Sequence, residues 1–138
     1  MTAYIDTSAL LRVILREPGA LDDLRSYETL VSSELLAVES ARTIDRLRLH
    51  GALTVEEAAV RLRTITEWLE AIDLVLLRPP VLSRASEPLP IPLGTLDAIH
   101  LATALIWRER MGALATVATH DSALGLAART FGFDVRGI

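Results

Sequence analysis

Four acidic residues stand where apolar runs of this chain end or where helices are expected. Asp6 and Asp121 each follow a short apolar run, whereas Glu39 and Asp97 lie among apolar neighbours in segments expected to be helical. An ionised carboxylate beside apolar segments is costly to desolvate unless it is paired or coordinates a cation. Several converging carboxylates offer the oxygen ligands that Mg²⁺ and Mn²⁺ prefer. The pattern therefore indicates a metal-dependent enzyme that acts on phosphates.

Three of these acids also have an ordinary structural explanation when each is taken singly. Asp6 and Asp121 suit turns or helix N-caps, and Asp97 would favour the start of a helix electrostatically. Glu39 fits such an explanation poorly, because it lies mid-helix among apolar residues. In an open parallel sheet, ligands bind beyond the carboxyl ends of the strands, where Asp6 and Asp121 are expected. Topology therefore allows the acids to meet.

The elements that would position these acids alternate along the chain. Strands are expected at 2–6, 29–32, 72–77, 113–119 and 133–136, and helices at 8–15, 19–27, 33–50, 54–70, 96–110 and 122–129. Such alternation predicts an α/β fold, a three-layer α/β/α domain with a central parallel sheet. The segment 79–92 holds five of the six prolines, and is either a short helix flanked by rigid loops or a loop bordering the site.

Two local signals sharpen this outline of helices. Ser33 is expected to cap the helix that runs to His50, and Thr54 opens the next helix with Glu57 completing a capping box. The two long helices, 33–50 and 54–70, are expected to pair as a hairpin.

Length and composition limit the number of domains, the make-up of the core and the location of the protein. A chain of 138 residues predicts a single domain over 1–138, and its 51% hydrophobic and 4% aromatic content predicts a core of Leu, Ala, Ile and Val. No uncharged apolar run reaches the roughly 18 residues of a membrane span. The start lacks the basic and apolar stretches of an export signal. We therefore expect no membrane association and a cytoplasmic location.

The residue types that are absent exclude several chemistries. All 14 basic residues are arginine, so neither a phosphate-binding P-loop nor a Schiff base can form, and a receiver-like phosphoacceptor is disfavoured. Without cysteine there is no thiolate nucleophile or cysteine-based zinc site. The net charge of −4 is unusual for a nucleic-acid enzyme, but cations bound to the four acids would offset it. Charge alone neither supports nor forbids an RNA partner.

Four groups of short motifs follow one another along the chain in a specific order. They are Tyr4 to Leu11 (YIDTSALL), Ser32 to Leu35 leading to Glu39, Leu96 to Ala104 (LDAIHLATA), and Thr119 to Asp121 followed by Phe131 to Val135. Their order and spacing resemble the PIN-domain ribonucleases, in particular the VapC-type toxins of prokaryotic toxin–antitoxin pairs. The resemblance implies Mg²⁺ or Mn²⁺ as cofactor, endonucleolytic cleavage of RNA, a homodimer, and inhibition by a cognate antitoxin.

Carried over residue by residue, the acidic quartet of that family falls on Asp6, Glu39, Asp97 and Asp121. Hydrolysis of a phosphodiester needs a nucleophile and a way to spread negative charge, and water bound to one or two divalent cations supplies both. Asp6, Asp97 and Asp121 are assigned as direct or water-bridged metal ligands. Glu39 either completes the metal shell or orients the attacking water.

Polar neighbours of the acids are candidates for supporting roles. Ser8 and Thr119, and less so Thr7, could hydrogen-bond a ligand carboxylate or the scissile phosphate, and Ser8 is included in the catalytic set. His100, one helical turn after Asp97, is expected to be a structural or site-rim residue. His120 is expected to be incidental.

Two arginines follow Glu39 at helical spacing. Arg42 and Arg46 stand at i+3 and i+7, so the three residues share one helix face. The arginines either hold Glu39, bind the RNA backbone, or form a solvated basic face. The sequence thus predicts a metal-dependent endoribonuclease toxin. The alternative is a non-catalytic PIN-fold module that sequesters RNA or a protein.

Overall fold

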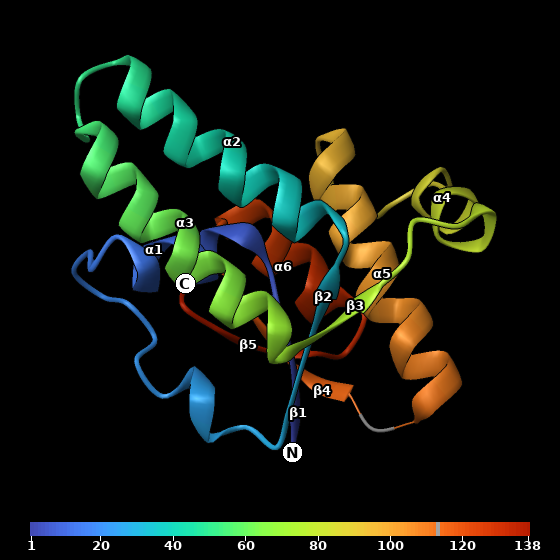
Figure 1. Cartoon of the computed structure of the whole chain (residues 1–138). Helices are drawn as coiled ribbons and strands as arrows, with labels where there is room; N and C mark the ends of the chain where they lie inside the picture. Colours follow the sequence, from blue (N-terminus) through green and yellow to red (C-terminus); the bar gives the residue numbers. More distant parts are fainter. Residues whose placement is uncertain (113) are drawn as a thin grey trace.

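A five-stranded parallel sheet with the strand order β3-β2-β1-β4-β5 forms the centre of the computed structural model, which describes residues 1–112 and 114–138 (Figure 1). All four strand pairings are parallel. The strands are β1 (Thr2–Ile5), β2 (Thr29–Ser33), β3 (Ile72–Val75), β4 (Leu114–Ala118) and β5 (Asp134–Arg136). The helices are α1 (Thr7–Ile14), α2 (Leu35–Leu49), α3 (Val55–Glu70), α4 (Pro79–Ala85), α5 (Thr95–Met111) and α6 (Ser122–Thr130), with a short 3₁₀ turn, η1, at Leu24–Ser26.

Both faces of the sheet are covered by helices, because side chains of a strand alternate between its two faces. Ala3 and Ile5 of β1 pack in one apolar cluster with residues of α1, α2 and α3. Tyr4, which lies between them, packs on the other face with residues of α5 and α6. The predicted three-layer α/β/α architecture with a parallel sheet is confirmed.

The long helices α2 and α3 lie side by side as a hairpin (Figure 1). Their pairing follows from apolar stripes, since Leu36 and Ile44 of α2 are buried in the same cluster as Ala58 and Ile65 of α3. The predicted capping box is present: Thr54 Oγ1 accepts the backbone N–H of Glu57 at 3.0 Å, and Glu57 Oε1 accepts that of Thr54 at 3.2 Å. The second helix of the hairpin therefore begins where the sequence indicates.

The position of the site follows from the order of the strands. From β1 the chain moves outward through β2 to β3, and it then returns to place β4 on the opposite side of β1. Loops that leave β1 and β4 therefore diverge at a topological switch point, which is where open parallel sheets bind ligands. The backbone N–H of Asp6 donates to Ala118 O at 3.2 Å, so the end of β1 is tied to the end of β4.

Three predicted elements differ from the structure. The helix expected at 19–27 is wrong: only the turn Leu24–Ser26 is helical, and Leu24 is its one buried residue, so the segment has no apolar stripe to hold a longer helix on the core. The helix expected from the cap Ser33 begins later, at Leu35, because Ser33 still belongs to β2, although its hydroxyl accepts the N–H of Leu35 at 3.1 Å. The third strand ends at Val75, two residues before the expected Leu77.

Two remaining expectations concern the proline-rich segment and the fourth strand. The short-helix alternative for 79–92 is correct, since α4 starts with Pro79 and Pro80 in its first turn, where the missing N–H costs nothing. Ala113, the expected start of the fourth strand, lies outside the described residues. Over the part of the chain that is described, no helix has the length and apolarity needed to cross a membrane.

Candidate active site

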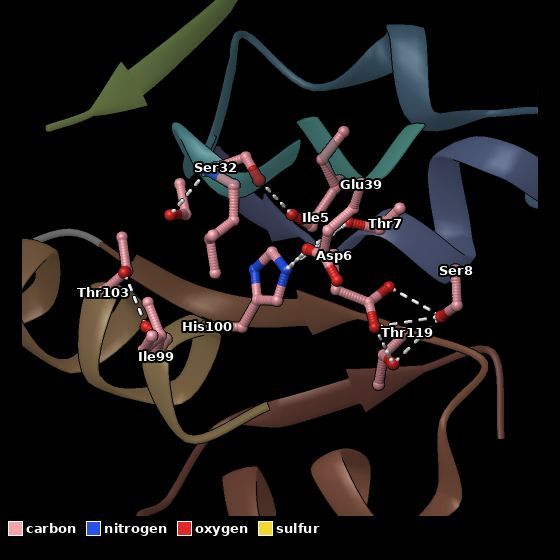
Figure 2. A network of polar contacts seen from close by, with 12 residues as sticks. Ile5, Asp6, Thr7, Ser8, Ser32, Glu39, Ile99, His100, Thr103 and Thr119 are labelled. Atoms are coloured by element: carbon pink, nitrogen blue, oxygen red, sulfur yellow. Dashed lines mark hydrogen bonds and ion pairs between the residues drawn. The ribbon is translucent and has the colours of Figure 1, made fainter. Parts of the chain in front are cut away.

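Asp6 lies directly after β1 and caps α1. Its Oδ1 accepts the backbone N–H of Ala9 at 2.9 Å, and Ser8 Oγ lies 2.7 and 2.9 Å from its two oxygens (Figure 2). Thr119 Oγ1 donates to Oδ2 at 2.7 Å. Burial raises the pKa of Asp6, while the hydrogen bonds from Thr119, Ser8 and Ala9 act in the opposite direction. The carboxylate is therefore buried and held at both oxygens.

Ser8 and Thr119 also join the two loops at the switch point. Ser8 Oγ accepts the N–H of His120 at 2.9 Å, and Thr119 Oγ1 accepts the N–H of Asp121 at 2.9 Å. Thr119 has no exposed surface, so its hydroxyl supports Asp6 and the loop rather than facing solvent. The loop carrying Asp121 is thus positioned by the same two hydroxyls that hold Asp6.

Glu39 on α2 is held from a different direction. Its Oε1 accepts a hydrogen bond from Thr7 Oγ1 at 2.8 Å and lies 2.7 Å from His100 Nε2 (Figure 2). Partial burial acts to raise the pKa of Glu39, but the hydrogen bonds from His100 and Thr7 act against it, and the net effect is a lowered pKa. Glu39 is therefore ionised.

Asp97 and Asp121 complete the set. Asp97 lies in the first turn of α5, and Asp121 caps α6 through a bond from Leu124 N to Oδ1 of 2.8 Å. Burial raises the pKa of Asp97, and the charges of Asp121, Asp6 and Glu39 raise it further, against the opposing effect of His100. All four predicted acids therefore belong to one region of negative potential.

Oxygen donors of this kind suit a hard divalent cation, and their charge is not balanced by arginine. In the described residues, none of the ion pairs made by arginine involves Asp6, Glu39, Asp97 or Asp121. Yet across residues 1–112 and 114–138 no three His, Asp or Glu side chains lie close enough together to hold one ion. Donor chemistry and charge therefore fit Mg²⁺ or Mn²⁺, but the side chains as placed do not form a complete coordination shell.

The sequence matches the family model of the PIN domain over residues 3–128, which is most of its length and includes all four acids. The chain belongs to the PIN domain family. It is 36% identical over 137 residues to Ribonuclease VapC46 of Mycobacterium tuberculosis strain H37Rv, with 96% of this chain and 94% of the relative covered. Ribonuclease VapC47 of Mycobacterium tuberculosis strain CDC 1551 is 32% identical over 133 residues, with 94% and 92% covered. The predicted resemblance to the VapC-type PIN proteins is confirmed.

The fold of this PIN domain is also similar to a solved structure. The crystal structure of PAE2754 from Pyrobaculum aerophilum matches with a TM-score of 0.63 over 98% of this chain and 89% of that chain. The sequence identity is 18%, so the likeness concerns the fold alone.

One alternative was that the arginines on α2 hold Glu39, and the structure does not show this contact. Arg42 pairs with Asp45 at 3.0 Å, and Arg46 donates to Thr43 Oγ1 at 3.2 Å. Both arginines are exposed. The partner of Glu39 is His100 instead.

Sequence reasoning placed His100 as a structural or rim residue and missed its bond to Glu39. His100 is 2% exposed, and its Nδ1 lies 2.7 Å from the hydroxyl of Tyr4 on β1. One signal could have revealed this role: a histidine inside the apolar run of α5, one turn after Asp97, must be buried and therefore needs partners. His120 also has a partner, since its Nδ1 lies 2.7 Å from Gly137 O.

Proposed function

We propose that this PIN domain is a divalent-metal-dependent endoribonuclease that acts as the toxin of a toxin–antitoxin pair. Asp6, Glu39, Asp97 and Asp121, here called the acidic cluster, are near enough for their charges to interact, although as placed they do not form a coordination shell. The observation that carries the proposal is that the charges of Asp121, Asp6 and Glu39 raise the pKa of Asp97. Two relatives named as ribonucleases, each similar over nearly the whole chain, support the activity on RNA.

Asp6, Asp97 and Asp121 would hold Mg²⁺, or Mn²⁺ in its place. The ion would supply a nucleophile at neutral pH and balance the negative charge that develops on the phosphate. Asp6 is fixed by three donors, whereas Asp97 makes no hydrogen bond within the described residues, so the side chain of Asp97 would be the one that adjusts to the ion. Glu39 completes the site, and Ser8 keeps Asp6 in position.

RNA would approach over the end of the sheet that carries these acids. Arg42 and Arg46 are candidates for phosphate contacts because their exposed guanidinium groups lie on the helix that carries Glu39. Arg46 makes no ion pair among the described residues, so its charge is the more available of the two.

Exposed apolar side chains support protein partners, namely a cognate antitoxin and a second copy in a homodimer. A groove of about 700 Å³ lies between α4, the proline-rich loop and the first turns of α5, and it is lined mainly by apolar side chains. Leu82 at its edge and Leu96 beside it are 44% and 48% exposed. We further propose that the protein acts in the cytoplasm, where RNA and antitoxin are found.

The test is RNA cleavage by purified protein freed of any antitoxin. Wild-type protein with Mg²⁺ is expected to cut RNA internally, and chelation of divalent ions or the change Asp97→Asn should lower the rate by about 100-fold or more, since either removes charge stabilisation from the transition state. Cleavage that survives both treatments would reject the mechanism. If expression arrests growth equally in wild type and Asp6→Ala, the protein acts by sequestering RNA or a protein instead.

A further inference from the structure

A buried imidazole connects the core of the sheet to the acidic cluster. The ring of His100 lies between β1, α2 and α5, with Nε2 2.7 Å from Glu39 Oε1 (Figure 2). Its Nδ1 lies 2.7 Å from the hydroxyl of Tyr4. Tyr4 is 1% exposed, and its ring meets the imidazole edge-on at a centroid distance of 5.9 Å. Both ring nitrogens of His100 are therefore engaged, and the ring has one orientation.

The hydrogen bonds that link Tyr4, His100 and Glu39 have a definite direction from donor to acceptor. An ionised carboxylate only accepts, so the hydrogen between His100 and Glu39 must be on Nε2. In a neutral ring, Nδ1 then accepts, and the hydroxyl of Tyr4 donates to it. A tyrosine phenol carries its hydrogen at neutral pH, so Tyr4 can donate.

No neighbouring hydroxyl replaces Tyr4 as that donor. Ser32 Oγ donates to the backbone carbonyl of Ile5 at 2.7 Å, and Thr103 Oγ1 donates to that of Ile99 at 2.7 Å. Each hydroxyl has a single hydrogen, and both hydrogens are used on backbone oxygens. Tyr4 is therefore the group that determines which nitrogen of His100 carries the hydrogen.

The two oxygens of Glu39 differ in what they bind. Oε1 receives both the bond from Thr7 and the bond from His100. Within the described residues, Oε2 has no hydrogen bond, and the charge of Glu39 acts on Asp97. One oxygen thus anchors the side chain, and the other is left for a ligand.

We propose that Tyr4 and His100 are positioning residues that fix the Nε2–H tautomer, anchor Glu39 by Oε1, and leave Oε2 to bind a divalent cation. This inference rests on the proposed function, since it assigns the anchored carboxylate to the same ion site. Groups that orient metal ligands from behind commonly set metal affinity and activity by about 10 to 100-fold. The hydroxyl of Tyr4 acts on Glu39 through two successive hydrogen bonds, so its effect should be near the lower end of this range, about 10-fold.

The tautomer can be observed directly without RNA or metal. Long-range ¹H–¹⁵N NMR spectra of metal-free protein labelled at histidine should show a protonated Nε2 and an unprotonated Nδ1 for His100. A ring protonated at Nδ1 alone, or at both nitrogens at neutral pH, would overturn the role given to Tyr4.

A matched pair of tyrosine variants tests the effect on ion binding. Tyr4→Phe removes only the donor to His100, whereas Tyr27→Phe makes the same change at a hydroxyl that accepts from Arg136 at 3.1 Å. Calorimetric titration with Mn²⁺ should give about a 10-fold weaker affinity for Tyr4→Phe and no change for Tyr27→Phe. In RNA cleavage, Tyr4→Phe should lower kcat and leave KM unchanged. Equal Mn²⁺ affinity for wild type and Tyr4→Phe would contradict the proposal.

Variants of His100 test whether another N–H donor can replace the imidazole, and whether Tyr4 acts through His100. Gln can donate an N–H towards Glu39 but Leu cannot, so His100→Gln should retain most of the Mn²⁺ affinity that His100→Leu loses, with circular dichroism confirming that both fold. Adding Tyr4→Phe to His100→Leu should cause no further loss, because Tyr4 acts only through the imidazole. Equal and additive losses would mean that both residues merely support the core.

Failure of this inference can be told apart from failure of the proposed function. A protein that binds Mn²⁺ in a Tyr4-dependent manner but cuts no RNA keeps the positioning role and loses the ribonuclease. A protein that cuts RNA with Mn²⁺ equally well with Phe at position 4 keeps the ribonuclease and loses the positioning role. Absence of Mn²⁺ binding to the folded wild type would reject both.

Discussion

Asp6 and Asp97 both have a raised pKa, but for different reasons. Asp6 is 3% exposed and held by Ser8, Thr119 and the N–H of Ala9, so its burial is offset by hydrogen bonds. Asp97 is half-buried and makes no hydrogen bond within the described residues, and the charges of three other carboxylates raise its pKa. The first acid is part of the structure of the sheet edge, whereas the second is destabilised by surrounding negative charge, which a bound cation would neutralise.

This difference separates two roles of the acids in the site, which are structural anchoring and the accumulation of negative charge. The Asp6 side, with Ser8 and Thr119, is a rigid anchor that completes α1 and joins two loops. The Asp97 side carries unfavourable negative charge, which a bound ion would relieve. Removing either acid should therefore abolish function, but the effects on folding should have opposite signs.

Alanine at each acid is the sharpest test of that contrast. Asp6→Ala and Asp97→Ala should each lower RNA cleavage by about 100-fold or more. In denaturant unfolding with EDTA, Asp6→Ala should destabilise by about 2 kcal/mol, since it removes an N-cap and leaves buried donors unpaired. Asp97→Ala should be as stable as wild type or more stable. Equal destabilisation by both changes would remove the distinction.

The pH dependence of stability has a defined sign. A raised folded-state pKa means that the native protein binds the proton of Asp97 more tightly than the unfolded chain does. Asp97 therefore favours folding below its ordinary value of 3.8 and opposes it as the pH rises through the folded-state value. The advantage of Asp97→Ala over wild type should shrink as the pH falls from 7 towards 4, and an advantage independent of pH would point to helix propensity instead.

Divalent ions should stabilise the wild type more than Asp97→Asn, which lacks the negative charge of Asp97. Mn²⁺ at about a hundred times its dissociation constant would add about 2.7 kcal/mol to the free energy of unfolding. Asp97→Asn should lose most of this gain in a thermal melt. Mg²⁺ is expected to act in the same direction, and a monovalent salt of equal ionic strength is the control.

A glycine substitution disturbs the anchor without changing an acid. Gly137 has a φ of +106°, and a Cβ there would overlap the backbone oxygen of Thr119. Gly137→Ala should destabilise by about 2 kcal/mol, from backbone strain and displacement of the loop that carries Thr119 and Asp121. Gly51→Ala, at a φ of +77° with open space around it, is the matched control and should cost about 1 kcal/mol. If both cost the same, the loop tolerates the displacement.

The smallest effect is expected from the arginines on α2. Arg46→Ala should raise KM for RNA about 3-fold and reduce its salt dependence, while leaving kcat unchanged. Arg63→Ala removes the same charge from the exposed face of α3 and should have no effect. A loss of kcat in Arg46→Ala would place this side chain against the reacting groups instead.

Much of this molecule could be predicted from sequence because local signals agreed with one another. The capping box of Thr54 and Glu57 fixed the start of α3, and the ordered motifs identified the four acids. The helix expected at 19–27 failed because its charged and small residues leave one buried side chain, Leu24, to hold it. Propensity without an apolar stripe was not enough.

The partners within the site were harder to predict because they depend on how close separate elements approach. Arg42 stands three residues after Glu39 but also three residues before Asp45, and sequence spacing cannot choose between the two. The bond of His100 to Glu39 requires α5, α2 and β1 to meet at one point. Helix spacing placed His100 near Asp97 but could not supply the position of α2.

The hydrogen bond between Thr119 and Asp6 joins residues 113 positions apart, and it forms only after β4 has been added beside β1. The anchor therefore cannot form before residue 119 has emerged from the ribosome. A nascent or truncated polypeptide would lack the assembled acid cluster. The pairing of β4 with β1 would thus delay any cutting of RNA until the chain has been made at least as far as Asp121.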